Sequence, residues 1–369
     1  MNQELWHRWM QRALELAEDG RFGASPNPMV GAVVVDPRGE PIGEGAHVRC
    51  GGAHAEINAL AAAGERARGG TLVVNLEPCS HHGKTPPCVA AVIAAGIQRV
   101  VVGCLDPNPL VSGAGVSSLR SAGLDVVVGV EEAACRSLNA RFFHWITRGL
   151  PFVTLKMAIS LDGKLAARGG ASRWITGEEA RRAGHLLREE YDAILIGVGT
   201  VLADNPRLVR HLGLHPDPHL RRVVLDSSLR TPSTSMLLQV AARDTVLFCT
   251  PAAAPQRRQE LEATGATVVE VAAAGQRCDL WQVVRWLAQH QVSSLLVEGG
   301  GEVHWSFLHE GLVQRVHAFL APLLMGGREA IPAVGGAGFA SPQESVRLHF
   351  STIRRWGDDL ELVAEGCHV

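Results

Sequence analysis

The spacing of apolar and polar residues predicts alternating helices and strands in the first half of the chain. Residues 4–18 carry an apolar residue every three or four positions, which predicts an amphipathic helix. Two apolar runs, at 29–36 and 41–48, flank the turn-forming sequence PRGE and predict a β-hairpin. Further helices are predicted at 54–64, 88–96, 115–123 and 131–146, and further strands at 71–76, 99–106 and 124–130. This order predicts a helix–sheet–helix sandwich of five strands.

The pattern restarts after TRGLP at 147–151, where we place the domain boundary, and predicts a second α/β domain. Its strands are predicted at 152–160, 191–199, 221–227, 244–250, 266–275, 293–301, 315–324, 345–353 and 359–365, and its helices at 178–190, 256–264, 279–290 and 302–311. The sequence VEGGGEV at 297–303 suits either a bound pyrophosphate or an ordinary tight connection. No G-x-G-x-x-G follows a strand, so the Rossmann fingerprint is absent.

Composition and charge favour small-molecule chemistry. The chain has 369 residues, 46% of them hydrophobic, which is enough for roughly two or three packed domains. With 35 basic and 37 acidic residues and a formal charge of −2, the charge balance does not call for a nucleic-acid or membrane partner. The first 20 residues mix charges into their apolar pattern, unlike a signal peptide or a membrane anchor, so we expect a cytoplasmic protein. A homo-oligomer is compatible with these features.

Four residues between positions 54 and 88 have the chemistry of a catalytic zinc site. His54, Cys79 and Cys88 form a ligand set that leaves a fourth position open for water. Glu56, two residues after the histidine, is expected to carry a proton from that water to a leaving amine. Zinc nucleobase deaminases share His-x-Glu followed by Pro-Cys-x-x-Cys. Here eight residues separate the cysteines, so the thiolates must come from different turns, with Cys88 at a helix start.

Other interpretations of this region stay open. A lone cysteine or histidine is usually a packed residue, and only the combination beside two helix starts favours a metal. His81 and His82, between the cysteines, compete as ligands or could reach a substrate. The loop DPNP at 106–109 follows a strand and is either a ligand loop or a plain turn. A deaminase acting on nucleic acid would need a basic surface, and a closed structural zinc module would need four protein ligands.

The arginines of the second half also have two interpretations. Arg181, Arg182 and Arg188 share the predicted helix at 178–190, and Arg207 and Arg210 follow in a nearby loop. Interspersed glutamates favour a solvated face with local ion pairs. One or two of the arginines could instead bind a phosphate through paired N–H donors, and the sequence does not decide which.

The motifs along the chain occur together in one known family. In order they are NPMVGAVVV, HAEINAL, EPCSHHGKTPPC, DPNPLVSGAG, LKMAISLDGK, WITG, ADNPRL and VEGGGEV. Over nearly its whole length the chain resembles the bifunctional riboflavin-biosynthesis proteins that couple a pyrimidine deaminase to a reductase. The resemblance implies an N-terminal cytidine-deaminase-like α/β/α sandwich at 1–147 and a C-terminal dihydrofolate-reductase-like α/β domain at 148–369. The first would use Zn²⁺ to deaminate a diamino-hydroxy-ribosylaminopyrimidine phosphate, and the second would use NADPH to convert the product's ribosyl group to ribityl.

The resemblance also implies the residues of both sites. The zinc ligands fall on His54, Cys79 and Cys88, and the proton carrier on Glu56. The positions implied for NADPH are Ala158, Trp174, Thr200, Asp204, Ser227, Gly300 and Gly301. Those implied for the reductase substrate, a small-molecule pyrimidine ribose phosphate, are Ser172, Arg188, Leu208, Arg210 and Glu298.

Overall fold

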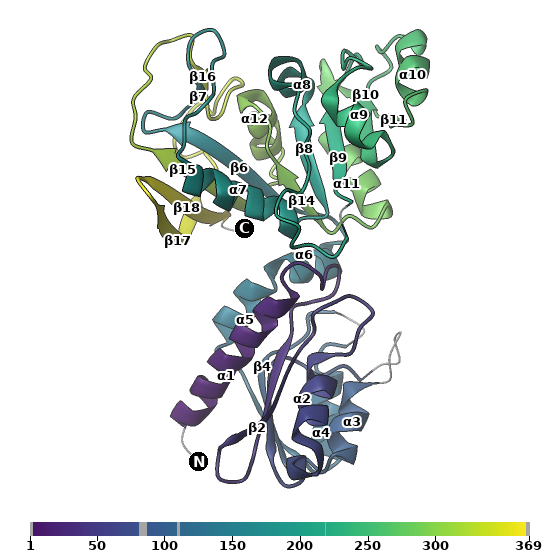
Figure 1. Ribbon diagram of the computed structural model, residues 1–369, viewed down its shortest axis with the longest axis vertical. Helices are drawn as coiled ribbons and strands as arrows, with labels where there is room; N and C mark the ends of the chain where they lie inside the picture. Colours follow the sequence, from purple (N-terminus) through teal and green to yellow (C-terminus); the bar gives the residue numbers. More distant parts are fainter. Residues whose placement is uncertain (1–2, 81–86, 109–110, 218, 367–369) are drawn as a thin grey trace. The chain divides into compact units, whose positions relative to one another are not determined.

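The computed structural model describes residues 3–80, 87–108, 111–217 and 219–366 (Figure 1). Its contacts divide the chain into two units, Met1–Gly149 and Leu150–Val369, so the division falls inside the TRGLP segment. Each unit builds its core around a sheet of its own. Among the described residues, no helix combines the length and the apolarity needed to cross a membrane.

The first unit holds the predicted five-stranded sheet, in the order β2-β1-β3-β4-β5. β1 pairs antiparallel with β2 and β3, whereas β3, β4 and β5 run parallel. Its helices and strands are α1 (Gln3–Ala17), β1 (Gly31–Val35), β2 (Pro41–Ala46), α2 (Ala55–Ala63), β3 (Thr71–Leu76), α3 (Cys88–Ala94), β4 (Arg99–Cys104), α4 (Ala114–Ser121), β5 (Asp125–Val128), α5 (Glu132–Leu138) and α6 (Ala140–Arg148).

Helices cover both faces of this sheet. α1 and α5 pack on one face, against β1, β3 and β4, and α2 and α4 pack on the other (Figure 1). β1 and β3 are therefore buried along their whole length, which explains their continuous apolar runs. Gly31 permits the close approach of α1, because a Cβ at this position would lie 2.0 Å from the carbonyl oxygen of Ala13.

The prediction of one helix at 131–146 is wrong, because Asn139 divides it into α5 and α6. The buried Asn139 side chain accepts a hydrogen bond from the Met29 N–H at 2.8 Å and donates one to the Met29 carbonyl at 2.9 Å. Asn139 itself leaves the helical region, at φ −100° and ψ 19°. Helical periodicity cannot report a contact with a residue 110 positions away.

The second unit is built on a nine-stranded sheet in the order β11-β10-β9-β8-β14-β6-β15-β18-β17. The strands from β11 to β15 are parallel, and β18 and β17 are antiparallel. The strands are β6 (Phe152–Ser160), β7 (Lys164–Ala166), β8 (Ala193–Gly197), β9 (Arg221–Leu225), β10 (Thr245–Cys249), β11 (Thr267–Glu270), β12 (Ala273–Ala274), β13 (Arg277–Cys278), β14 (Ser294–Val297), β15 (Arg315–Ala321), β16 (Ile331–Pro332), β17 (Leu348–Trp356) and β18 (Asp359–Gly366). The helices are α7 (Glu178–Glu190), α8 (Val198–Asp204), α9 (Met236–Ala241), α10 (Pro255–Glu262), α11 (Leu280–Gln289) and α12 (Gly301–His309).

Three apolar clusters hold helices onto this sheet. One contains residues of α11 and α12, a second contains residues of α8, α9 and α10, and a third packs α7 against Leu296 and Phe319. The helices and strands predicted for this unit are confirmed with shifted bounds, except that the single strand predicted at 266–275 is wrong: β11 ends at Glu270, and β12 pairs with β13 in a separate two-stranded sheet. The short helices α8 and α9 were not predicted, because VGTVLAD and MLLQVA are too short to show a helical period.

Candidate active sites

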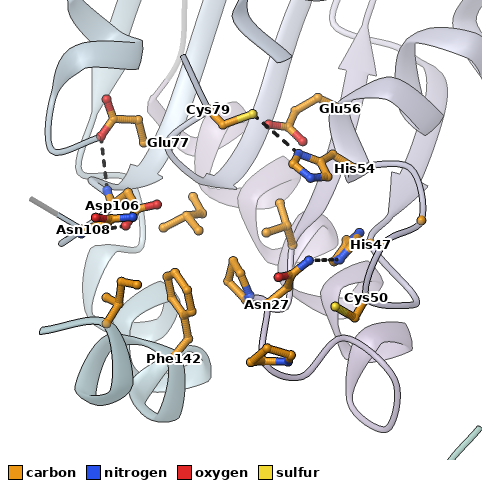
Figure 2. A pocket seen from close by; sticks show the side chains of 17 residues that line it. Asn27, His47, Cys50, His54, Glu56, Glu77, Cys79, Asp106, Asn108 and Phe142 are labelled. Atoms are coloured by element: carbon orange, nitrogen blue, oxygen red, sulfur yellow. Dashed lines mark hydrogen bonds between the residues drawn. The ribbon is translucent and has the colours of Figure 1, made fainter. Parts of the chain in front are cut away.

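His54, Cys79 and Cys88 lie together in the first unit although they are distant in sequence. His54 caps the start of α2, Cys79 follows β3, and Cys88 is the first residue of α3. The His54 Nδ1 atom is 3.2 Å from Cys88 Sγ and 3.6 Å from Cys79 Sγ. One donor atom from each residue lies within 4.8 Å of the others. The ends of three regular elements therefore bring these donors together, and Figure 2 shows two of them, His54 and Cys79, side by side.

This donor set fits a zinc ion. Ligand atoms of a tetrahedral site with bonds of about 2.0–2.3 Å are about 3.5 Å apart, close to the separations in this cluster. A shared hydrogen bond with Cys88 lowers the pKa of the Cys79 thiol to about 4 and raises the pKa of the Cys88 thiol. The Cys88 N–H also donates to Cys79 Sγ at 3.3 Å. The pair thus stabilises one negative charge, and a divalent cation would stabilise the second.

Within the described residues the cluster has three donors, which is the number an open catalytic site uses and one fewer than a closed structural site needs. His81 and His82, the competing ligands, lie outside the described residues.

Glu56 lies beside the cluster in the first turn of α2. Its side chain is buried, with 3% of the residue exposed, and Figure 2 shows its carboxylate next to Cys79 and His54. Burial raises the pKa of Glu56 to about 7. A carboxyl group with such a pKa can both accept and release a proton near neutral pH.

A cavity of about 370 Å³ adjoins these residues and has the size of a small-molecule site. Two of its polar residues, Asn27 and His47, were missed from the sequence. His47 Nδ1 lies 3.0 Å from the Ala53 carbonyl and therefore donates to it, and Nε2 accepts from Asn27 Nδ2 at 3.1 Å. Their positions are the signal that could have found them, because Asn27 precedes the first apolar run of the hairpin and His47 lies near the end of the second.

Glu77 organises the far end of the cavity. Its buried carboxylate accepts hydrogen bonds from the N–H groups of Asp106 at 3.2 Å, Gly113 at 3.0 Å and Val116 at 3.0 Å. These bonds hold the loop after β4 against Glu77, which lies two residues before Cys79. Asp106 and Asn108 line the cavity as a result, which favours the ligand-loop interpretation of DPNP, whose Pro109 lies outside the described residues.

In the second unit, most residues implied for NADPH lie along the edge of the sheet that is formed by the carboxyl ends of its parallel strands. Thr200 lies in α8, directly after β8, and Ser227 follows the end of β9. Gly300 caps α12 and Gly301 begins it, just after β14, while Ala158 lies near the end of β6. Because these strands are parallel, all five residues lie at carboxyl ends, where open α/β sheets bind ligands.

Arg188, Glu298 and Lys156 form a buried charged cluster at this edge. Arg188 donates from Nε and Nη2 to the two carboxylate oxygens of Glu298, at 2.9 and 2.7 Å. Lys156 Nζ lies 3.9 Å from Glu298 Oε2. Burial opposes ionisation of Glu298, but Arg188 and then Lys156 outweigh it and lower the pKa of Glu298 to about 2. Lys156 was missed because it lies inside the apolar run of β6.

The side chains of Arg210 and Leu208 make their contacts within the protein. Arg210 donates to the backbone carbonyls of Arg188, Tyr191 and Asp217, at 3.2, 2.8 and 2.8 Å. Leu208 is buried in the cluster that holds α8, and it adopts a left-handed φ of 49°. Each residue would therefore contact a substrate through its backbone, or would affect substrate binding by shaping the loop.

The remaining implied residues lie on the surface of the second unit. Trp174 is 69% exposed, and the Arg181 guanidinium lies 4.4 Å from the centre of its ring. Asp204 ends α8, and its carbonyl accepts from Arg173 at 3.4 Å. Ser172 is partly exposed, two residues before Trp174. The exposed aromatic ring of Trp174 is available to a ligand.

Two family profiles match the chain. Residues 151–362 match "RibD C-terminal domain", and residues 3–104 match "Cytidine and deoxycytidylate deaminase zinc-binding region". Curated relatives match nearly the whole chain. The riboflavin biosynthesis protein RibD of Actinobacillus pleuropneumoniae is 42% identical over 354 residues, which cover 96% of this chain and 93% of the relative. That of Bacillus amyloliquefaciens is 42% identical over 358 residues, which cover 96% and 95%.

Solved structures match to the same extent. Acinetobacter baumannii RibD superposes with a TM-score of 0.87 at 35% identity and covers 100% of both chains. A diaminohydroxyphosphoribosylaminopyrimidine deaminase/5-amino-6-(5-phosphoribosylamino)uracil reductase from Thermotoga maritima superposes with a TM-score of 0.84 at 35% identity, covering 99% of both. The predicted fold classes of both halves are confirmed.

Proposed function

Because this chain belongs to the RibD family of riboflavin-biosynthesis enzymes, which join a deaminase to a reductase, we propose a division of its residues between two reactions. The enzyme deaminates 2,5-diamino-6-ribosylamino-4(3H)-pyrimidinone 5′-phosphate and reduces 5-amino-6-(5-phosphoribosylamino)uracil with NADPH. We assign the first reaction to residues 1–147 and the second to residues 148–369. Support comes from the two contact units, which divide at Gly149 and Leu150.

The deaminase proposal rests on His54, Glu56 and Cys79, which line one cavity, and on Cys88, which contacts His54 and Cys79 behind it. We propose that the histidine and the two cysteines hold zinc, which when bound would lower the pKa of a water. Glu56 takes a proton as the water attacks the amine-bearing carbon of the pyrimidine. It then gives a proton to the leaving amine, so that ammonia departs. Asn27 and His47, paired along the cavity, orient the polar edge of the pyrimidine.

For the second reaction, NADPH supplies the hydride and the protein supplies orientation. We propose that the cofactor binds along the carboxyl edge of the sheet, at Ala158, Trp174, Thr200, Asp204, Ser227, Gly300 and Gly301. We propose that the substrate is held by Ser172, Arg188, Leu208, Arg210 and Glu298. The cluster of Arg188, Lys156 and Glu298 supports this because its two cations and one carboxylate leave one positive charge for a phosphorylated substrate.

The decisive experiment supplies the diaminopyrimidine phosphate to the purified protein, with and without NADPH, and identifies the products by mass spectrometry. Without NADPH we expect the deaminated product alone, and with NADPH the reduced product. Separately expressed halves, divided after Gly149, are expected to divide the two activities. If the first half bound zinc without deaminating, the assignment of that reaction to residues 1–147 would be wrong.

We propose a small-molecule substrate and no nucleic-acid or membrane partner, since basic and acidic residues nearly balance. Free thiols at all the described cysteines suit the reducing conditions of the cytoplasm. We also propose a homo-oligomer, because the edge strand β17 exposes Phe350 and Ile353, at 66% and 63%. Light scattering of the purified chain would report its mass, and salt-dependent binding of single-stranded RNA would revive the nucleic-acid alternative.

A further inference from the structure

Helix α6 forms one wall of the deaminase cavity, although it directly precedes the end of the first unit. Phe142 and Ile146 both line the cavity, and their i, i+4 spacing places them on one side of the helix. No residue of α6 is fully buried, although the helix carries two phenylalanines, a tryptophan and an isoleucine. The apolar side of α6 is thus turned partly toward a cavity instead of entirely into the core.

A specific contact sets the position of this wall. Asn139, at the break between α5 and α6, binds both backbone groups of Met29. Met29 follows Asn27 and Pro28, which line the same cavity. The break in the helix therefore fixes Phe142 relative to the loop that carries Asn27.

Phe142 lies away from the reacting end of the cavity. Figure 2 shows Cys79, His54 and Glu56 together at one end, with Phe142 at the other. The pyrimidine carbon that loses its amine must lie beside Glu56. Whatever is attached to the pyrimidine must then extend toward Phe142 and the loop held by Glu77.

We propose that Phe142 is a specificity-determining residue of the deaminase, whose ring packs against the ribosyl part of the substrate. This inference rests on the proposed deaminase function. A ribosyl group presents C–H surface beside its hydroxyls, so an aromatic wall on one side and polar residues on the other, here Asp106 and Asn108, match its two kinds of surface. A free pyrimidine base bound at Glu56 would not reach this wall.

The neighbouring Phe143 supplies a matched control. It belongs to the same helix and packs against the same core as Phe142, but it does not line the cavity. The Arg136 guanidinium lies 5.7 Å from the centre of the Phe143 ring. Replacing Phe143 therefore removes comparable packing without touching the proposed substrate contact.

The test compares deamination of the phosphoribosyl substrate and of the corresponding free base, 2,5,6-triamino-4-pyrimidinone, by wild type, Phe142→Ala, Phe142→Leu and Phe143→Ala. Phe142→Ala is expected to raise KM for the phosphoribosyl substrate about ten-fold or more, with little change for the free base. Phe142→Leu should recover part of this loss. Phe143→Ala should leave both KM values unchanged, even if it lowers the melting temperature.

Zinc content and the melting temperature of each variant report whether its first unit is folded. An unchanged KM in a folded Phe142→Ala or Phe142→Leu variant would overturn the assignment, as would an equal loss for the two substrates. If the wild type itself did not deaminate the phosphoribosyl compound, the proposed function would fail, and this inference with it. The wild-type measurement therefore separates the two failures.

Discussion

Arg188 donates two hydrogen bonds to Glu298, and this pair is nearly enclosed in the second unit, with side chains 14% and 9% exposed. The sequence left two interpretations of Arg188 open: a residue of a solvated helix face, or an anchor for a phosphate. The structure shows a third environment, a buried ion pair between α7 and the residue after β14. Nε and Nη2 are used by Glu298, so a phosphate would have to bind the remaining donors of Arg188.

Replacing Arg188 with alanine should therefore impair both reduction and stability. The variant leaves the buried Glu298 carboxylate with Lys156 as its only nearby cation of the cluster. Breaking a buried pair by removing one partner costs about 3–5 kcal/mol. We expect reductase turnover to fall with a lower melting temperature, while deamination by the first unit is retained. Calorimetry and separate assays of the two reactions measure these effects.

Arg182 provides the control for this prediction, since it lies on the same helix and is exposed. Arg182→Ala should change neither activity nor stability noticeably. A stable Arg188→Ala enzyme with only a raised KM would show that Arg188 is mainly a substrate contact and that the pair with Glu298 is dispensable.

Glu56→Gln should abolish most deamination without removing zinc. The substitution keeps the size and burial of the side chain and leaves His54, Cys79 and Cys88 in place. General acid–base catalysis contributes about a hundred- to ten-thousand-fold, so kcat should fall within that range. Metal analysis of the same sample should still give one zinc per chain. Near-normal turnover would refute the role of Glu56 as proton carrier.

Cys88→Ala should instead release the metal. Its thiol lies 3.2 Å from His54 Nδ1 and shares a hydrogen bond with the Cys79 thiol, so its loss removes one ligand and disturbs a second. Cys104→Ala is the matched control, because Cys104 is equally buried in the same unit and lies outside the donor cluster. Zinc per chain, measured after dialysis, should drop for the first variant alone. Full retention of zinc by Cys88→Ala would exclude this cysteine as a ligand.

The sequence predicts those features that depend on neighbours in the chain. The helices that begin beside His54 and at Cys88 have local signals, namely apolar spacing, a glycine or proline at an end, and a preceding strand. Features that depend on distant contacts were missed. Asn139 breaks a helix because of Met29, and Lys156 reads as one polar residue in a strand until α7 and β14 bring Arg188 and Glu298 beside it.

Acid should weaken the second unit through Glu298. Arg188 and Lys156 outweigh the effect of burial and lower the pKa of Glu298 from 4.5 to about 2. Because the pKa is lower in the folded state, the stabilisation is complete above the unfolded-state value and is lost as the pH falls toward 2, a change of about 3 kcal/mol. Urea unfolding between about pH 2 and pH 6 would measure it.

Glu298→Gln should be less stable at the upper end of this range and should show a flatter pH dependence than the wild type. Glu178→Gln, at an exposed position of α7, should follow the wild-type curve. Parallel curves for Glu298→Gln and the wild type would mean that this carboxylate does not contribute to the acid sensitivity of the fold.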